Sequence, residues 1–146
     1  MAGFNHNNST LRVCIDCVKG RTISGRVLSR RLTEPYHFPD LNSLVLQMEA
    51  VFDAQNFPQA YQRLRTFLRV DGKGALAAAD PDSGMTEEEV NAGRGQVATV
   101  ELRVVSRRNS TWQGTVNWLD SSVIQEFSSY LELMHIADEK LFGKME

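Results

Sequence analysis

The residues near the start of the chain that could do chemistry are two cysteines, in the run Cys14-Ile15-Asp16-Cys17. A CxxC pair is redox-active when its first thiol lies at a helix N-terminus, where backbone N–H groups lower the thiol pKa. Here the pair falls within a strand pattern, in which residues three apart point to opposite faces. A structural zinc site would need two further ligands, and the histidines at 6, 37 and 135 are isolated. We therefore expect incidental, reduced thiols and no metal.

Other catalytic signatures are missing from the sequence. It contains no nucleotide-binding glycine loop, GxSxG, HExxH or EF-hand spacing. The acidic run Glu87-Glu88-Glu89 lies in a stretch of small and polar residues, where charged side chains are usually exposed to solvent. We expect a protein that is not an enzyme and needs no cofactor. A fold that gathers catalytic residues scattered along the sequence stays open as an alternative.

Five arginines form the candidate binding site for an anion or nucleic acid. They occupy strand positions opposite the apolar residues: Arg12, Arg26, Arg30, Arg103 and Arg107. If helices cover one face of a single sheet, the other face carries these arginines and suits an anionic partner. Sheet surfaces that bind single-stranded nucleic acid usually expose aromatic residues, whereas Trp112 and Trp118 share the predicted core face. The competing interpretation is a solvated face with cross-strand ion pairs.

Alternating strands and one helix must position the first of these arginines. Over residues 11–18, the predicted core-facing residues are Leu11, Val13, Ile15 and Cys17. A turn at Lys19-Gly20 and renewed alternation over 22–29 indicate a β-hairpin. Residues 33–38 fit a third strand that Pro35 restricts to a sheet edge. Asp40 is a suitable N-cap for an amphipathic helix over residues 41–54.

The last third of the chain shows the same order of patterns. Residues 98–105, with Val105 out of pattern, and 112–119 alternate around a turn at 107–110, and residues 121–127 fit a third strand. The run from Ser129 to Glu132 has the sequence of a capping box at the start of a helix. The apolar stripe of that helix consists of Leu133, Met134, Ala137 and Leu141.

A constant offset of 89 residues relates the two regions, because it carries Gly25 onto Gly114 and Phe38 onto Phe127. We interpret this as a duplication. The predicted fold is α+β, with two tandem β-β-β-α repeats whose antiparallel sheet is packed by two amphipathic helices. Neither repeat is large enough to bury its sheet and helix alone, so both should share one core.

The predicted domain organisation has four parts within one domain. Residues 1–10 form a disordered tail, 11–70 the first repeat with a C-terminal extension, 71–96 a flexible connector and 97–146 the second repeat. The extension over 60–70 fits a strand or more helix. In the connector, large apolar residues are nearly absent, so no apolar face is expected to dock a helical turn at 86–89.

Length, composition and charge indicate an ordinary globular protein. The chain has 146 residues, of which 42% are hydrophobic and 23% charged. It lacks a membrane-length apolar run and a secretory signal, so we expect a cytoplasmic protein with no membrane contact. Its net charge of −2 conceals basic strand regions and acidic helical regions, since residues 101–118 carry +2 and 119–146 carry −4.

Two stretches, residues 32–67 and 101–141, resemble a group of small uncharacterised bacterial proteins. The most similar motifs are Asn56-Phe57-Pro58-Gln59-Ala60 and Trp112-Gln113-Gly114. The resemblance implies an intracellular bacterial protein and no particular chemistry. More loosely, tandem strand-rich repeats ending in a helix resemble the topology of the Whirly and purine-rich-element-binding proteins, which bind single-stranded nucleic acid.

These observations lead to two functional hypotheses. The first is a non-enzymatic binding or scaffold module, forming a homodimer and engaging a protein or peptide partner, because an unpaired sheet edge is a template for another strand. The alternative is nucleic-acid or polyanion binding through the arginine-bearing sheet face, which would depend on salt.

Overall fold

The computed structural model describes residues 4–6, 8–58, 76–108, 111–121 and 123–142. The first region contains β1 (Leu11–Lys19), β2 (Thr22–Leu28), β3 (Tyr36–Phe38) and α1 (Leu41–Gln55). A 3-10 helix, η2 (Pro81–Ser83), and α2 (Glu87–Ala92) follow. The second region contains β4 (Ala98–Ser106), β5 (Gln113–Trp118), β6 (Val123–Phe127) and α3 (Tyr130–Phe142).

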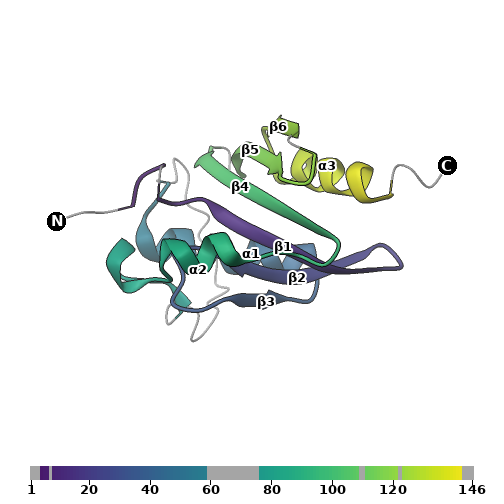
Figure 1. Cartoon of the computed structure of the whole chain (residues 1–146). Helices are drawn as coiled ribbons and strands as arrows, with labels where there is room; N and C mark the ends of the chain where they lie inside the picture. The colour runs from purple at the N-terminus through teal and green to yellow at the C-terminus, as the bar shows by residue number, and fades with distance from the viewer. Residues whose placement is uncertain (1–3, 7, 59–75, 109–110, 122, 143–146) are drawn as a thin grey trace.

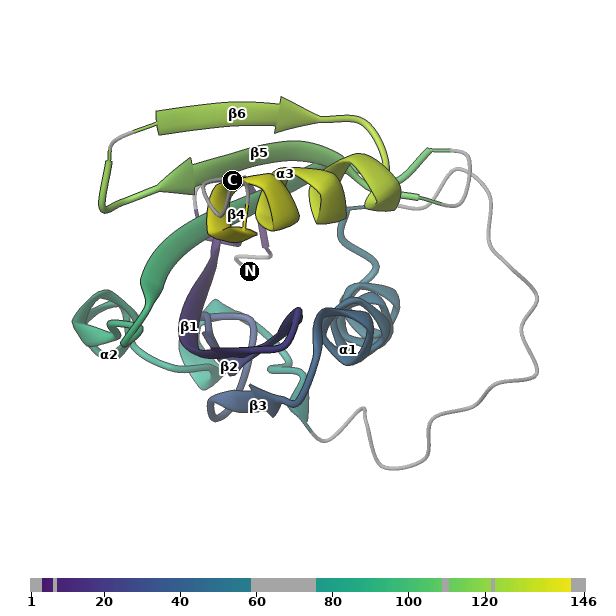
Figure 2. The ribbon, with the colours of Figure 1, turned by 90° about the vertical axis from the view of Figure 1, so that its right-hand side faces the viewer.

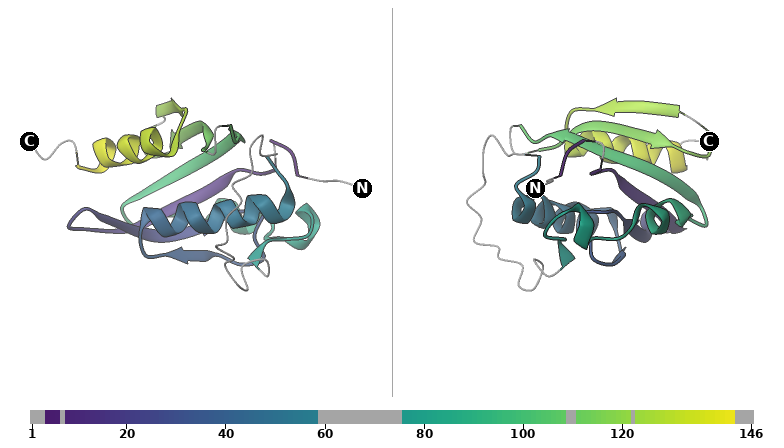
Figure 3. Two further views of the ribbon diagram at one scale, coloured as in Figure 1. Left: turned by 180° about the vertical axis from the view of Figure 1, so that it is seen from behind. Right: turned by 60° about the vertical axis from the view of Figure 1, so that its left-hand side comes forward.

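Within these residues the six strands form one antiparallel sheet in the order β3-β2-β1-β4-β5-β6 (Figure 1). The predicted α+β class and antiparallel sheet are confirmed. The sheet is curved, and α1 and α3 lie on its concave face (Figure 2). Seen from behind, α1 crosses one half of the sheet and α3 the other (Figure 3). None of the described helices is long and apolar enough to cross a membrane.

The core lies between the concave face and the two helices. Strand alternation supplies one side of it, as in Val100, Leu102 and Val104, which are all buried. The apolar stripe of α1 supplies the other side, with Met48 and Val51 fully buried. The sheet and the helices thus bury each other's apolar faces, which neither could do alone.

A β-bulge interrupts each long hairpin and reverses the alternation beyond it. In the first hairpin the pairing shifts between Ile15 and Cys17, and in the second between Val104 and Ser106. An extra residue moves every later side chain to the opposite face. Val18 therefore packs against the core, while Cys17 is exposed. The prediction that Cys17 faces the core is wrong for this reason.

Glycines allow close approach beside both bulges. A Cβ atom on Gly25 would lie 1.9 Å from the carbonyl oxygen of Cys14, and one on Gly114 would lie 1.8 Å from that of Arg103. Each glycine is paired with a buried phenylalanine on the next strand, Phe38 for Gly25 and Phe127 for Gly114. An aromatic ring beside a strand glycine compensates for the missing side chain.

The two halves of the sheet meet at β1 and β4. The ladder places Arg12 opposite Glu101 and Val13 opposite Val100. An ion pair of 3.2 Å joins Arg12 to Glu101, and the Arg12 side chain is almost wholly buried. Strands far apart in the sequence are therefore hydrogen-bonded at the centre of the molecule.

Residues 76–97, called the cover segment below, begin beside the end of α1, where Leu76 and Ala77 pack against the main core, and then cross the other face of the sheet. The helix α2 begins with a capping box between Thr86 and Glu89. Met85 and Val90 form a second buried cluster with Cys14 and Leu28. The prediction that this part of the connector has no apolar face is wrong, because two apolar residues are enough to dock a short helix. Residues 71–75 lie outside the described residues.

Helix ends follow the predicted capping residues closely. Asp40 accepts a hydrogen bond of 2.7 Å from the backbone N–H of Ser43, and α1 ends at Asn56 in the left-handed conformation. At α3, Ser129 Oγ accepts from the N–H of Glu132. The Glu132 carboxylate accepts from the N–H of Ser128, one residue before the predicted cap. The predicted third strand is shorter than expected, since β3 begins only after Pro35.

The described residues before β1 also make contacts, although this part of the chain was predicted to be a disordered tail. The ring of His6 lies 5.1 Å from that of Phe57. The guanidinium of Arg31 lies 5.6 Å from the ring of Phe4. The predicted extension over 60–70 falls outside the described residues.

Candidate binding groove between two helices

The structure does not gather the five candidate arginines into one free surface. Arg12 is buried, and its Nε donates a 3.0 Å hydrogen bond to the carbonyl oxygen of Gly93 in the cover segment. Arg26 donates two hydrogen bonds to Asp16, at 2.8 and 3.3 Å, and a third to the carbonyl oxygen of Arg94. The bonds from Arg26 hold the pKa of Asp16 below its usual value. These two guanidinium groups therefore hold the cover segment on the sheet.

The other three candidates differ in exposure and partners. Arg30 donates to the carbonyl oxygen of Pro81 at 3.3 Å. Arg103 is exposed, and its side chain has no hydrogen-bond or ion-pair partner within the part of the chain that the structure describes. Arg107 lies on the opposite, concave side, because the bulge at Val105 reverses its direction. The prediction that Arg107 lies on the arginine face is therefore wrong. The signal for the bulge in the sequence is Val105, which interrupts the alternation.

Arg107 belongs to a buried polar network at one side of α1. Its Nε donates to the carbonyl oxygen of Pro58 at 2.6 Å, and its Nη1 donates to Glu49 at 3.0 Å and Asp53 at 2.7 Å. Glu49 also accepts hydrogen bonds from Trp112 Nε1 at 2.7 Å and the Tyr130 hydroxyl at 3.4 Å. One carboxylate thus connects α1, the start of β5 and α3.

The network changes the titration of Tyr130. Burial and the charge of Glu49 raise the pKa of the Tyr130 hydroxyl well above its usual value. The hydroxyl therefore stays protonated and acts as a donor. The Arg107 Nη2 atom is buried and has no hydrogen-bond partner among the described residues.

Another buried arginine, Arg31, lies close to this network. Its guanidinium carbon is 4.2 Å from the centre of the Phe52 ring, and the ring of Phe57 is a further neighbour at 5.5 Å. Its Nε donates to Gln55 at 2.8 Å, and its Nη2 donates to the carbonyl oxygen of Phe57. Burial and the charge of Arg107 lower the pKa of Arg31 to about 9. We infer that Arg31 and Arg107 both stabilise the C-terminal end of α1.

The candidate site is a groove between α1 and α3, floored by β1, β4 and β5. At its base is a cavity of about 50 Å³. Every lining residue is apolar: Val13, Ile15, Leu41, Leu44, Val45, Val100, Leu102, Val116, Trp118, Leu133, Met134, Ile136 and Ala137. Such a surface attracts an apolar group and offers nothing to hydrogen-bond a polar one.

Beside this cavity is a wider, partly polar mouth of about 360 Å³. Leu41 and Met134 line both hollows, so the two are adjacent along the helices. The titratable lining residues of the mouth are Arg21, Asp40, His135 and Asp138. On the rim, Leu131 is 81% exposed.

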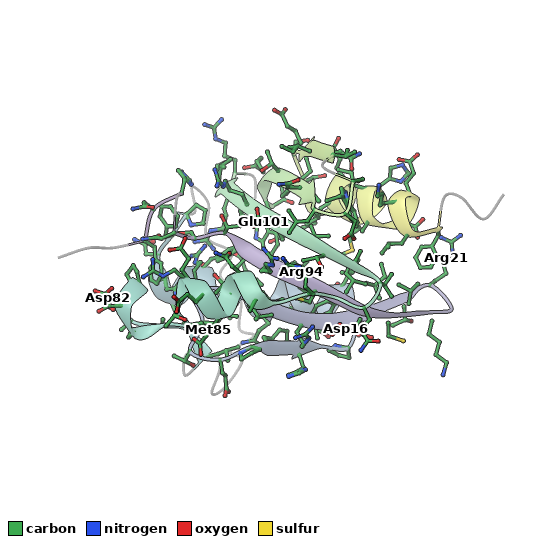
Figure 4. The ribbon with its side chains drawn as sticks, in the orientation of Figure 1. Asp16, Arg21, Asp82, Met85, Arg94 and Glu101 are labelled. Atoms are coloured by element: carbon green, nitrogen blue, oxygen red, sulfur yellow. The ribbon has the colours of Figure 1, made fainter. Side chains whose placement is uncertain are left out.

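Arg21 closes one end of the mouth. It lies in the β1–β2 turn with φ at 76°, and its Nη1 donates a 2.7 Å hydrogen bond to Asp138 of α3. Its guanidinium also lies 4.9 Å from the centre of the Phe142 ring. Figure 4 shows Arg21 beside the C-terminal end of α3. Both members of the ion pair are at least half exposed, so they can exchange partners at low cost.

The sequence identified the apolar stripes of both helices but not the groove. A stripe predicts that a helix face is buried, yet it does not predict the distance between two helices on the same sheet. One difference between residues 89 apart in the sequence does indicate the cavity. The position of Met48, fully buried in α1, corresponds to Ala137 in α3, and the smaller side chain leaves room at the cavity.

Comparisons of the chain with protein-family models, curated proteins and solved structures find no match. The resemblance of residues 32–67 and 101–141 to small bacterial proteins stays a prediction.

Proposed function

We propose that this protein is a cytoplasmic, non-enzymatic binding module whose α1–α3 groove holds an apolar side chain of a basic protein or peptide segment. The observation that supports the proposal is the wholly apolar cavity, which lies beside a mouth rimmed by the exposed Leu131. Binding sites are concave and mostly apolar, with few polar groups that set orientation. An exposed leucine beside such a hollow adds apolar area that a partner would bury.

The charge of the mouth favours a basic partner. Two carboxylates, Asp40 and Asp138, line the mouth together with one guanidinium, Arg21. The outer part of α3 adds Glu132 and Glu139 against one lysine, Lys140. A lysine or arginine next to the apolar anchor would meet this excess of negative charge, which increases the association rate at low salt.

A peptide library displayed on phage and selected against the immobilised protein tests this function. We expect enriched peptides that combine an apolar residue with neighbouring Lys or Arg. Leu131→Asp should weaken their binding about 10-fold or more, because it removes apolar contact at an exposed site that does not support the fold. Ala137→Met should weaken the same peptides by filling the cavity while leaving the protein folded.

The matched control is Val105→Asp, which makes a similar change at a residue that is 41% exposed and does not line the groove. The control should bind the selected peptides as the wild type does. Selection that yields no consensus, or peptides that bind all four proteins equally, would remove the groove as the binding site.

We further propose that the two halves of the chain are copies of one β-β-β-α unit. In support, the 89-residue offset relates the two bulges, the two glycine–phenylalanine pairs and the helices that follow. It also relates Arg12 to Glu101, which lie opposite each other in the β1–β4 ladder. Leu11 faces Leu102, the counterpart of Val13, as a pseudo-two-fold axis near Arg12 requires.

A further inference from the structure

The two edges of the sheet differ in how open they are to another strand. The edge strand β3 has three residues, and Pro35 and Pro39 stand immediately on either side of it. Proline has no N–H to donate and blocks pairing at an edge. The opposite edge strand, β6, has five residues, none of them proline. On β6, Val123 is 42% exposed and Ile124 is 65% exposed.

The 89-residue offset shows which residue replacements make the two edges different. Pro35 beside β3 corresponds to Ile124 in β6, and Pro39 corresponds to Ser128. Both edges are therefore built on the same pattern of residues, and only one of them is blocked. An unblocked, apolar edge strand is a surface for strand pairing.

We propose that β6 pairs antiparallel with β6 of a second copy, so that the two sheets become one continuous sheet across a two-fold axis. Two copies can join their sheet edges in three ways. The prolines exclude β3–β3 pairing, and they exclude head-to-tail β3–β6 pairing, which would not close and would build fibres. The β6–β6 pairing is closed and leaves outward only the two blocked β3 edges.

The side chains of β6 select one of the three registers that overlap more than one residue of each strand, those with an axis at Ile124, Gln125 or Glu126. Directly opposed residues share a face, so the axis passes beside one residue of β6 that faces its own copy. An axis at Glu126 opposes two carboxylates, and an axis at Gln125 opposes Ile124 to a carboxylate, which are both unfavourable. An axis at Ile124 places it against the partner's Ile124 and places Gln125 against the partner's Val123. Apolar contact therefore lies at the centre of the interface.

Light scattering coupled to size-exclusion chromatography, run over a dilution series, tests the pairing. We expect wild type to show twice the chain mass of 16.4 kDa. Ile124→Lys should raise the dimer Kd about 100-fold or more, because it sets two ammonium groups against each other on the axis. The matched control is His37→Lys on β3, which is also an exposed edge position and should leave the dimer unchanged.

A mixing experiment distinguishes pairing at Ile124 from a general loss of folding. Ile124→Lys and Ile124→Glu should each be monomeric alone and should form a mixed dimer when combined, because opposite charges then meet on the axis. Circular dichroism of each variant should match that of wild type. A monomeric wild type at every concentration, a dimer that Ile124→Lys does not weaken, or no recovery on mixing would overturn the proposal.

Discussion

At Arg107, one extra residue upstream decides on which side of the sheet a guanidinium lies. Val105 is the residue added by the second bulge, and beyond it the side chain of Arg107 points to α1 instead of away from the core. There it is 2% exposed and bonded to Glu49 and Asp53. A residue that a strict alternation would place in solvent is therefore one of the most buried groups in the protein.

We predict that Arg107→Ala lowers the free energy of unfolding by about 2 kcal/mol, because it removes a buried side chain together with its hydrogen bonds to Pro58 and to two partly exposed carboxylates. Arg103→Ala should change it by less than about 0.5 kcal/mol, since that side chain is exposed. Urea titration of both variants measures the difference. Equal effects of the two substitutions would contradict the role given to Arg107.

Sequence reasoning succeeded at residues whose position depends on local alternation and failed beyond the bulges. Arg12 and Arg26 lie on the predicted face, because they precede or oppose the first bulge. Cys17 and Arg107 lie on the face opposite to the one predicted, because each follows an inserted residue. A bulge leaves only a weak signal in the sequence, such as the out-of-pattern Val105.

At the scale of elements, the cover segment converts the arginine face into a mostly occupied surface. Backbone carbonyl oxygens of Gly93 and Arg94 accept hydrogen bonds from arginines of β1 and β2. Asp16 completes this arrangement by accepting from the N–H of Gln96 at 3.1 Å as well as from Arg26. The cover segment is thus attached by polar contacts around its small apolar cluster.

We predict a pH-dependent role for Asp16. Because Arg26 lowers the pKa of Asp16 in the folded protein, its ionised form stabilises the fold above about pH 4, and this contribution is lost as the pH falls further. Asp16→Asn should therefore cost about 1 to 2 kcal/mol at pH 7. The difference from wild type should shrink as the pH falls through the lowered pKa of Asp16.

Urea titrations at several pH values from 7 down to 2 measure this difference. Asp138→Asn is the control, because its ion pair with Arg21 is exposed and should be worth less than about 1 kcal/mol. A deficit of Asp16→Asn that persists unchanged into acid would show that the charge of Asp16 is not its source.

Most elements could be predicted from the sequence, because their signals are local. Asp40 marks the start of α1, and Pro35 limits the third strand to an edge. The docking of α2 could not be predicted. It depends on Met85 and Val90 meeting Cys14 and Leu28, and a contact between distant segments has no period in the sequence.

At the scale of the whole molecule, the central ladder and the packing across it should make the two halves unfold together. Trp112 of the second half lies 5.1 Å from Phe52 of α1, ring centre to ring centre, and β1 pairs with β4. We predict one transition in urea, with the same midpoint for tryptophan fluorescence and for labelling of the buried Cys14 thiol.

The labelling requires a Cys17→Ser background, because Cys17 is exposed and would react in the folded protein. Tryptophan fluorescence reports the second half, which holds both tryptophans, whereas Cys14 reports the first. Labelling of Cys14 at urea concentrations that leave fluorescence unchanged would mean that the cover segment or the first half opens by itself.

The α+β class could be predicted because it depends only on which patterns occur in the chain. The order of strands could not, since alternation specifies the faces of a strand and not its neighbours. The groove depends on that order as well, because β1 and β4 must be adjacent for α1 and α3 to lie side by side over them.

The ion pair between Arg12 and Glu101 has a consequence for ancestry. In a dimer of two identical units, a residue on the symmetry axis faces itself, so any charge there meets its own sign. Once the two units belong to one chain, that position can mutate separately in each. If the two halves are copies of one unit, as we propose, a guanidinium facing a carboxylate at the centre of the sheet arose only after the copies could diverge, so the duplication is older than the present pairing of charges.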